Sequence, residues 1–256
     1  IGLATSNASG GYGVGKIYQS SKITLTGANT YTGATTLTNT TVSVNSGTPN
    51  YYSKTALGAL SIDGASGSLG TGAVSNNGVL MFNKSTNLTV AAPIAGTGVV
   101  YKANSNTVTF NGASSYTGLT YLDTGALIYT NNATPTTSGF TGTGAITIQP
   151  VASSSFTSAF TPSYTFASTL TGLTLGHSLN AKTINITSPI SISGPIKVYG
   201  GYIYVSADLT ATGGSILLNA DTGTTLSQST EGITLGTGVD IKTLTSGDIT
   251  LIGRSG

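Results

Sequence analysis

Apolar and polar residues alternate in short runs along most of the chain. Clear examples are Lys22–Gly27, Thr35–Val44, Asn106–Gly112 and Gly144–Gln149, and Gly, Asn or Ser residues separate the runs. A period of two is typical of a strand with one buried face, and no window has a convincing helical period of 3.6 residues. The pattern therefore predicts an all-β fold built from many short strands.

In the second half, pairs of apolar residues recur with one residue between the two members. Pro189 and Pro195 stand between such pairs, where a corner needs no backbone donor. The strands are too short and too evenly spaced for helical crossovers, so we expect a solenoid with about 17 to 25 residues per coil. The pairs that we expect to face inward are Ile184 and Ile186, Ile190 and Ile192, Ile196 and Val198, Ile203 and Val205, Ile216 and Leu218, Ile233 and Leu235, and Ile249 and Leu251.

One eleven-residue phrase occurs twice in the first half. It reads GANTYTGATTL at Gly27–Leu37 and GASSYTGLTYL at Gly112–Leu122, and neither copy contains an acid, a base or a thiol. A catalytic motif would carry reactive groups, so the phrase is interpreted as a structural coil unit. Tyr31 and Tyr116 are then expected to stack at matching places.

These phrases resemble the passenger-associated transport repeat of bacterial autotransporter adhesins. Gly27–Thr36 fits that repeat well, and Gly112–Thr120 fits less well because Ser114 and Ser115 replace its Asn and Thr. From Leu173 onward the chain is similar to repeat-rich surface exoproteins related to filamentous haemagglutinins. Together the resemblances imply a right-handed parallel β-helix (β-solenoid), with repeats of the first type in 1–138 and of the second in 139–256, on one continuous rod.

The segment 134–171 fits this scheme least well. It is rich in aromatic residues, and the spacing of four through Phe156, Phe160 and Tyr164 fits either a short helix or a loop anchored on the rod. Pro162 interrupts any helix. We therefore predict an irregular, aromatic-rich excursion from the solenoid near 134–171.

The composition narrows the classes of partner. Thr occurs 47 times and Gly 36 times, only 6% of residues are charged, and the net charge is +2 with no run of Lys. This charge is too small and dispersed to favour nucleic acid, and no apolar stretch is long enough to insert in a membrane. The absence of Cys suits an extracellular or cell-surface location, and both chain ends suggest a segment of a longer protein.

Candidate catalytic residues are sparse. The single histidine, His177, adjoins Ser178, but adjacent strand residues point to opposite faces, and no acid is near in sequence. Asp221 and Asp240 are separated by about one coil, and are the carboxylates expected to stack if the chain is a carbohydrate-active enzyme. The sequence predicts no catalytic, cofactor or metal site, since isolated Asp residues are also common in turns.

A candidate contact surface lies at Ile196–Val205. If the apolar residues there face inward, Lys197, Tyr199, Tyr202 and Tyr204 face outward, with Gly200 and Gly201 as the corner between two strands. We expect the three tyrosines to share one outer face. Three interpretations stay open: a platform for sugar rings, a contact with a neighbouring subunit, or internal packing. We favour internal packing, in which the tyrosines shield a strand edge or pack on the aromatic excursion.

The function expected from this sequence is mechanical. The best interpretation is a non-enzymatic stalk or passenger segment of a large secreted bacterial surface adhesin, with partners on host or neighbouring cells, glycans included. The first alternative is a subunit of an extracellular filament that assembles end to end, because open solenoid ends expose unpaired backbone groups. The second is a carbohydrate-active β-helix enzyme.

Overall fold

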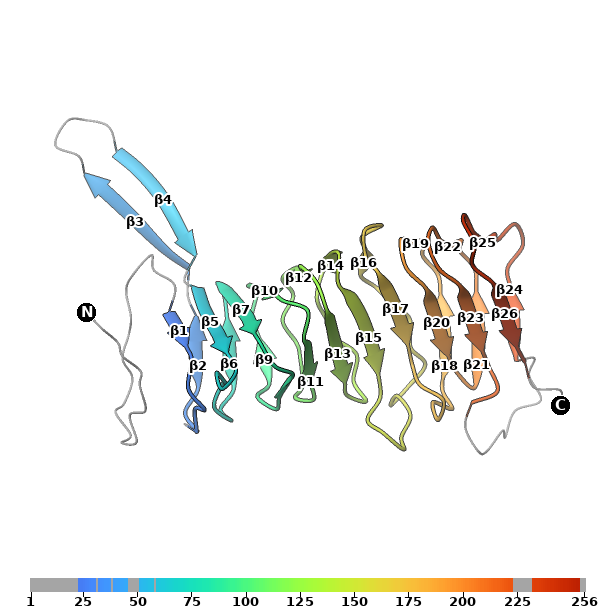
Figure 1. Cartoon of the computed structure of the whole chain (residues 1–256), viewed down its shortest axis with the longest axis horizontal. Helices are drawn as coiled ribbons and strands as arrows, with labels where there is room; N and C mark the ends of the chain where they lie inside the picture. The colour runs from blue at the N-terminus through green and yellow to red at the C-terminus, as the bar shows by residue number, and fades with distance from the viewer. Residues whose placement is uncertain are drawn as a thin grey trace.

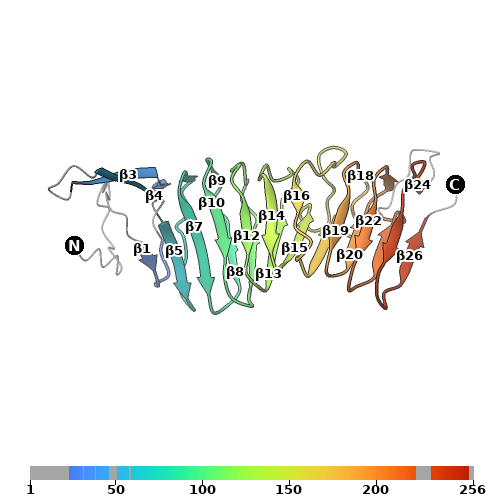
Figure 2. The same ribbon diagram turned by 90° about the horizontal axis from the view of Figure 1, so that it is seen from above.

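The chain folds entirely into β-strands and loops over the residues that the structure describes. The computed structural model describes residues 23–30, 32–37, 39–45, 51–57, 59–222 and 232–253, and these contain no helix. No helix in them is long and apolar enough to cross a membrane. All strand pairs but one are parallel, and the strands line up along an elongated row (Figures 1 and 2), an arrangement consistent with a β-solenoid.

Two long parallel sheets run along the row. The seven-stranded sheet contains, in spatial order, β1 (Ile23–Leu25), β5 (Ala59–Gly64), β7 (Val79–Lys84), β10 (Val99–Lys102), β12 (Thr120–Leu122), β14 (Gly139–Gly142) and β16 (Thr165–Phe166). The eight-stranded sheet contains β8 (Leu88–Val90), β11 (Thr107–Phe110), β13 (Ala126–Thr130), β15 (Ala145–Gln149), β17 (Gly172–Leu175), β20 (Ile196–Tyr199), β23 (Ile216–Asn219) and β26 (Ile249–Ile252).

Three shorter parallel sheets complete the coils. The first is β2 (Thr35–Leu37), β6 (Val74–Asn76) and β9 (Ile94–Ala95); the second is β18 (Thr183–Ile186), β21 (Tyr202–Val205) and β24 (Ile233–Leu235); the third is β19 (Ile190–Ile192), β22 (Leu209–Ala211) and β25 (Ile241–Thr243). Successive strands therefore pass from sheet to sheet, and the chain returns to each sheet one strand further along.

The register gives the length of each coil. When the chain returns to the same sheet, Val79 pairs with Val99, Ala126 with Ala145, and Leu173 with Ile196. The separations of these partners along the chain all lie within the predicted range of coil lengths, so that prediction is confirmed for these coils. Each return adds about 4.8 Å, the distance between neighbouring strands.

Strict alternation places one side of each strand in a continuous core. In β18, Ile184 and Ile186 are buried and pair with Ile203 and Val205, which are also buried. Five of the seven pairs predicted to face inward are buried, whereas in the last described coil Ile233 is half-buried and Leu235, Ile249 and Leu251 are exposed. Each fully buried Ile or Leu contributes about 1.5–3 kcal/mol, so the stack of side chains is the main source of stability.

Two strands leave the parallel pattern. β3 (Asn39–Asn45) and β4 (Tyr51–Leu57) form an antiparallel hairpin that projects from the N-terminal end of the row (Figure 1). The hairpin is inserted within the first coil, so Ile23 of β1 pairs with Leu60, much further along the chain than the partners in later coils. The sequence indicated a strand at Thr35–Val44 but not this insertion.

The aromatic-rich segment is irregular but does not leave the solenoid. Ala145 pairs with Gly172, so this coil is longer than the one before it, and it still contributes β16 to the seven-stranded sheet. Phe156, Phe160 and Tyr164 are buried in the core, and Phe160 forms a bridge with Ile184 of the next coil. The segment is thus irregular and anchored by aromatic residues, as predicted, although its large rings lie in the core and it remains part of a coil.

The two copies of the repeated phrase lie at different places in the coil. The first ends in β2 and the second in β12, which belong to different sheets. Tyr31 lies outside the described residues. Tyr116 is fully buried, where its hydroxyl shares hydrogen bonds with Thr120 Oγ1 (2.7 Å) and with the Tyr129 hydroxyl. The expected stacking at matching places is therefore not supported, although a structural role for Tyr116 is clear.

The eight-stranded sheet continues from β8 to β26, across the predicted boundary between 138 and 139. Neighbouring strands pair on both sides of this point, for example β13 with β15. The division into two types of repeat stays a prediction, because both types form the same kind of parallel coil.

Candidate functional site

The predicted contact residues lie on β20 and β21, where alternation is regular. Ile196 and Val198 are buried in β20, whereas Lys197 is exposed and Tyr199 half-buried. The same pattern continues in β21, in which Ile203 and Val205 are buried and Tyr202 and Tyr204 are half-buried. The outward direction of all four candidate side chains is confirmed.

The four candidates do not share one face, which corrects the prediction. Lys197 and Tyr199 belong to the eight-stranded sheet, whereas Tyr202 and Tyr204 belong to the sheet of β18, β21 and β24. The turn at Gly200–Gly201 separates the two sheets. It needs glycine because a Cβ on Gly201 would lie 2.4 Å from the Ala181 carbonyl oxygen of the preceding coil.

Polar neighbours surround these tyrosines instead of other rings. Tyr204 lies between Asn185 and Thr234, and Tyr199 pairs with Asn219. Phe156, Phe160 and Tyr164 are buried, so their rings do not form an outer partner for these tyrosines. Whether any of the four residues contacts a partner stays a prediction.

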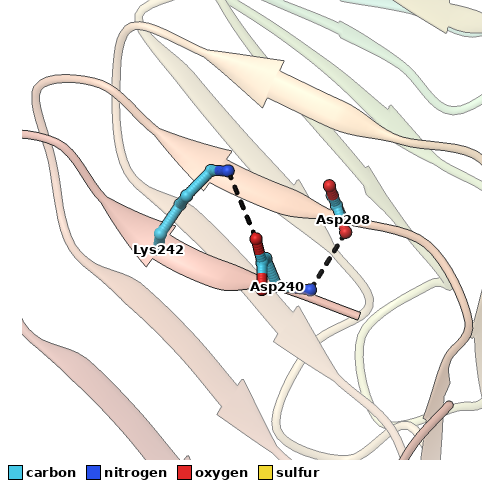
Figure 3. Close-up of polar contacts among 3 residues, drawn as sticks. All are labelled: Asp208, Asp240 and Lys242. Carbon is cyan, nitrogen blue, oxygen red and sulfur yellow. Dashed lines mark hydrogen bonds and ion pairs between the residues drawn. The ribbon is translucent and has the colours of Figure 1, made fainter. Parts of the chain in front are cut away.

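The carboxylates stack differently from the expected pair. Leu209 pairs with Ile241, because this coil also includes the segment 223–231 and is longer than its neighbours. Asp240 therefore lies next to Asp208 and not next to Asp221, and its backbone N–H donates to Asp208 Oδ1 at 2.9 Å (Figure 3). The predicted stack of Asp221 and Asp240 is wrong because it assumed a coil of constant length.

Lys242 completes this small polar group. Its Nζ lies 3.6 Å from Asp240 Oδ2, and both side chains are largely exposed (Figure 3). An exposed ion pair of this kind stabilises a protein by about 1 kcal/mol at most. The three residues lie on or beside β22 and β25. The carbonyl oxygen of Asp208 also accepts a hydrogen bond from the Ile190 N–H at 2.9 Å.

The side chain of His177 is held by hydrogen bonds with the backbone. Its Nδ1 accepts a hydrogen bond from the Leu179 N–H at 3.0 Å, and its Nε2 lies 3.2 Å from the Val151 carbonyl oxygen. This geometry fits the neutral tautomer with the proton on Nε2. Ser178 is exposed beside it in the turn. Both ring nitrogens are thus engaged by the backbone.

A stacked pair of tyrosines was missed by the sequence reasoning. Tyr101 of β10 and Tyr121 of β12 are paired in register, with ring centroids 4.9 Å apart and ring planes 5° apart. Desolvation, with the nearby Asp123 carboxylate and Tyr121, raises the pKa of Tyr101. The two tyrosines are separated along the sequence by the length of one coil. Once that length is known, the spacing predicts that both side chains lie in the same outer row.

Two buried lysines were missed as well. Lys102 Nζ donates to the carbonyl oxygens of Asn104 at 2.6 Å and Thr124 at 2.8 Å, and Lys84 Nζ donates to those of Gly67 and Ala65 at 2.6 and 2.8 Å. Desolvation lowers the pKa of Lys102 to about 8, against the opposing effect of Asp123, and also lowers the pKa of Lys84. Each lysine ammonium group thus donates hydrogen bonds to backbone carbonyl oxygens on the inner side of a corner between two strands.

In the part of the chain that is described, no three His, Cys, Asp or Glu side chains come together in a way that would hold a metal ion. In comparisons with known proteins, no family model, curated protein or solved structure matches this chain.

Proposed function

We propose that this chain is a non-enzymatic stalk or passenger segment of a large secreted bacterial surface adhesin, folded as a right-handed parallel β-helix. The observation that carries the proposal is the row of parallel coils with one continuous core (Figures 1 and 2). Each coil lengthens such a rod by about 4.8 Å, so a longer chain extends further from the cell. The resemblance of Gly27–Thr36 to a transport repeat adds the adhesin context.

The outer surface suits display outside a cell. Outward positions carry many Thr residues, such as Thr109, Thr147 and Thr174, so hydroxyl groups meet the solvent. The hairpin of β3 and β4 projects from one end and adds a lateral surface (Figure 1). We propose host or neighbouring cells, and their glycans, as partners, with the chain located at the cell surface or beyond it.

Immunolabelling of intact source cells tests this proposal. Antibodies raised against the purified chain should label unpermeabilised cells, and external protease should remove the label. Antibodies against a cytoplasmic protein are the matched control. Labelling that requires permeabilisation of the cells would contradict surface display.

A second function, a filament subunit, is favoured by the last described coil. Five apolar side chains are exposed here, and three of them pair with buried residues of the preceding coil. The edges of β24, β25 and β26 pair on one side only within the described residues. The exposed residues are Leu235, Leu244, Ile249, Leu251 and Ile252. Unpaired strand edges with apolar side chains favour association with another strand.

Leu251→Lys separates the two functions in the purified chain. Leu251 pairs with buried Leu218, so it occupies an inward position, whereas Thr250 occupies the outward one. If end-to-end assembly occurs, Leu251→Lys should abolish fibres in electron micrographs, and Thr250→Lys should keep them. Single rods in the parent chain at all concentrations would argue against the filament.

A further inference from the structure

One outer surface of the solenoid differs from the rest in its chemistry. On the central strands of the seven-stranded sheet, two outward rows are apolar or aromatic. Val79 pairs with Val99 and Met81 with Tyr101, which in turn pairs with Tyr121. Leu119 directly precedes Thr120, the partner of Val100, so it continues the row of Val99. This surface, which we call the tyrosine platform, consists of Val79, Met81, Val99, Tyr101, Leu119 and Tyr121.

The aromatic row of the platform ends with an accessible ring. Tyr101 and Tyr121 stack on one another, so each covers one face of its neighbour. The next residue in the row is Thr141, which pairs with Tyr121 and has a much shorter side chain. Tyr121 consequently keeps 38% of its surface exposed, and so does Leu119. The ring face beyond the stack is free to receive a flat apolar group.

A polar acceptor adjoins this ring. Asp123 follows two residues after Tyr121, on the same side of the chain, and is exposed. Its carboxylate is close enough to Tyr101 to raise the pKa of that hydroxyl, after the larger effect of desolvation. The row of Asp123 also contains Asn83, whose Oδ1 accepts from Asn104 Nδ2 at 2.8 Å. The Asp123 carboxylate is thus the acceptor beside the Tyr121 ring, because the Asn83 oxygen, two strands away, already accepts from Asn104.

We propose that Tyr121, supported by Tyr101 and Asp123, forms a binding site for a neutral carbohydrate. A pyranose ring has a C–H face that packs on an aromatic ring, and equatorial hydroxyls that donate to a carboxylate. This inference rests on the proposed function only for the biological role of the site, which is contact between an adhesin and glycans. It is a different surface from that of Lys197, Tyr199, Tyr202 and Tyr204.

The size of the platform favours a sugar over a protein. Stable protein interfaces bury about 800 Å² on each partner, with about 20–30 residues a side. The platform has only six side chains on three strands that lie about 4.8 Å apart. A few sugar units along the row would cover it, whereas a protein partner would need the surrounding Thr and Asn surface as well.

Binding of defined oligosaccharides tests the site. The probes are cellohexaose, maltohexaose and chitohexaose, followed by saturation-transfer NMR and by tyrosine fluorescence, which is unobscured because the chain has no Trp. The variants are Tyr121→Ala, which removes the ring, Tyr121→Phe, which keeps it, and Tyr202→Ala, a half-buried tyrosine on another sheet. Thermal melts verify that each variant is folded.

We expect at least one probe to bind, with Kd raised about tenfold by Tyr121→Ala and changed by less than about twofold by Tyr121→Phe and Tyr202→Ala. Asp123→Asn should weaken the same probe. The inference is overturned if no probe binds at about 10 mM, or if Tyr121→Ala binds like the parent. A protein captured in a Tyr121-dependent manner without sugar binding also overturns it. Surface labelling of cells does not depend on these outcomes, so the adhesin proposal stands or fails separately.

Discussion

Ile186 and Thr187 are neighbours in the chain with opposite environments. Ile186 is 1% exposed and pairs with buried Val205, whereas Thr187 is exposed at the end of β18. Ile186→Asp should lower the free energy of unfolding by about 3–5 kcal/mol, because it buries an unpaired charge and removes apolar contacts. Thr187→Asp should change it by less than about 0.5 kcal/mol. Urea denaturation measures both, and equal midpoints would contradict the inward assignment of Ile186.

Lys102 makes stability depend on pH. Its pKa is lowered from 10.5 to about 8 in the folded chain, so between these values the unfolded state binds more protons than the folded state. The free energy of unfolding should therefore rise with pH from about 8 to 9.5, by about 1 kcal/mol after allowance for screening by solvent. Above this range the buried Tyr116, Tyr129 and Tyr164, whose pKa values are raised by burial, oppose the rise. Urea melts across this range measure the rise.

Two lysine variants isolate that effect. Lys102→Met should lose most of the rise, with a smaller part left from Lys84, whose pKa is also lowered. It should also be less stable at pH 7, because the Asn104 and Thr124 carbonyl oxygens lose their donor. Lys197→Met removes an exposed lysine and should keep the rise. A pH profile of Lys102→Met that parallels that of the parent would show that another group is responsible.

Individual strands could be predicted where the alternation of apolar and polar residues alone is enough to define them. Ile190 and Ile192 indicated β19 because the two apolar residues bury themselves on one side of any strand. Spacing between elements was harder, since corners tolerate insertions that no strand pattern encodes. Asp240 was therefore assigned the wrong neighbour, and the burial of the large rings around Phe156 within the coil was not predicted. Tyr101 and Tyr121 were missed because their contact depends on the register between successive coils.

Corners between strands have their own requirement, which Gly201 illustrates. The turn from β20 to β21 passes so close to the preceding coil that a Cβ here would lie 2.4 Å from the Ala181 carbonyl oxygen. Gly201→Ala should therefore destabilise the fold by about 2 kcal/mol or more, because the backbone of one coil must move. Gly33→Ala is the control, since a Cβ there meets nothing within 4 Å. Thermal melts with equal midpoints for the two variants would contradict this close approach.

The molecule as a whole is a stack of interchangeable coils, which predicts tolerance to the loss of one coil. Val79 and Val99 occupy the same register position in successive coils, so joining Val79 directly to Val100 keeps every strand on its own sheet. The shortened chain then places Val100 over Leu60, and both side chains face the core. Removal of 80–99 should thus preserve cooperative unfolding, with a loss of a few kcal/mol from one fewer buried layer.

Removal of half a coil is the decisive control. Without 80–89, Val79 would be followed by Val90, and a strand of the seven-stranded sheet would run into a position that belongs to the eight-stranded sheet. Strands beyond the junction would then lose their register, and apolar residues would turn toward solvent. X-ray scattering should find the full-coil variant folded and shorter by about 5 Å, and the half-coil variant expanded. Comparable unfolding of both variants would mean that the coils are not equivalent units and that the register around Val79 and Val99 is specific to its place in the rod.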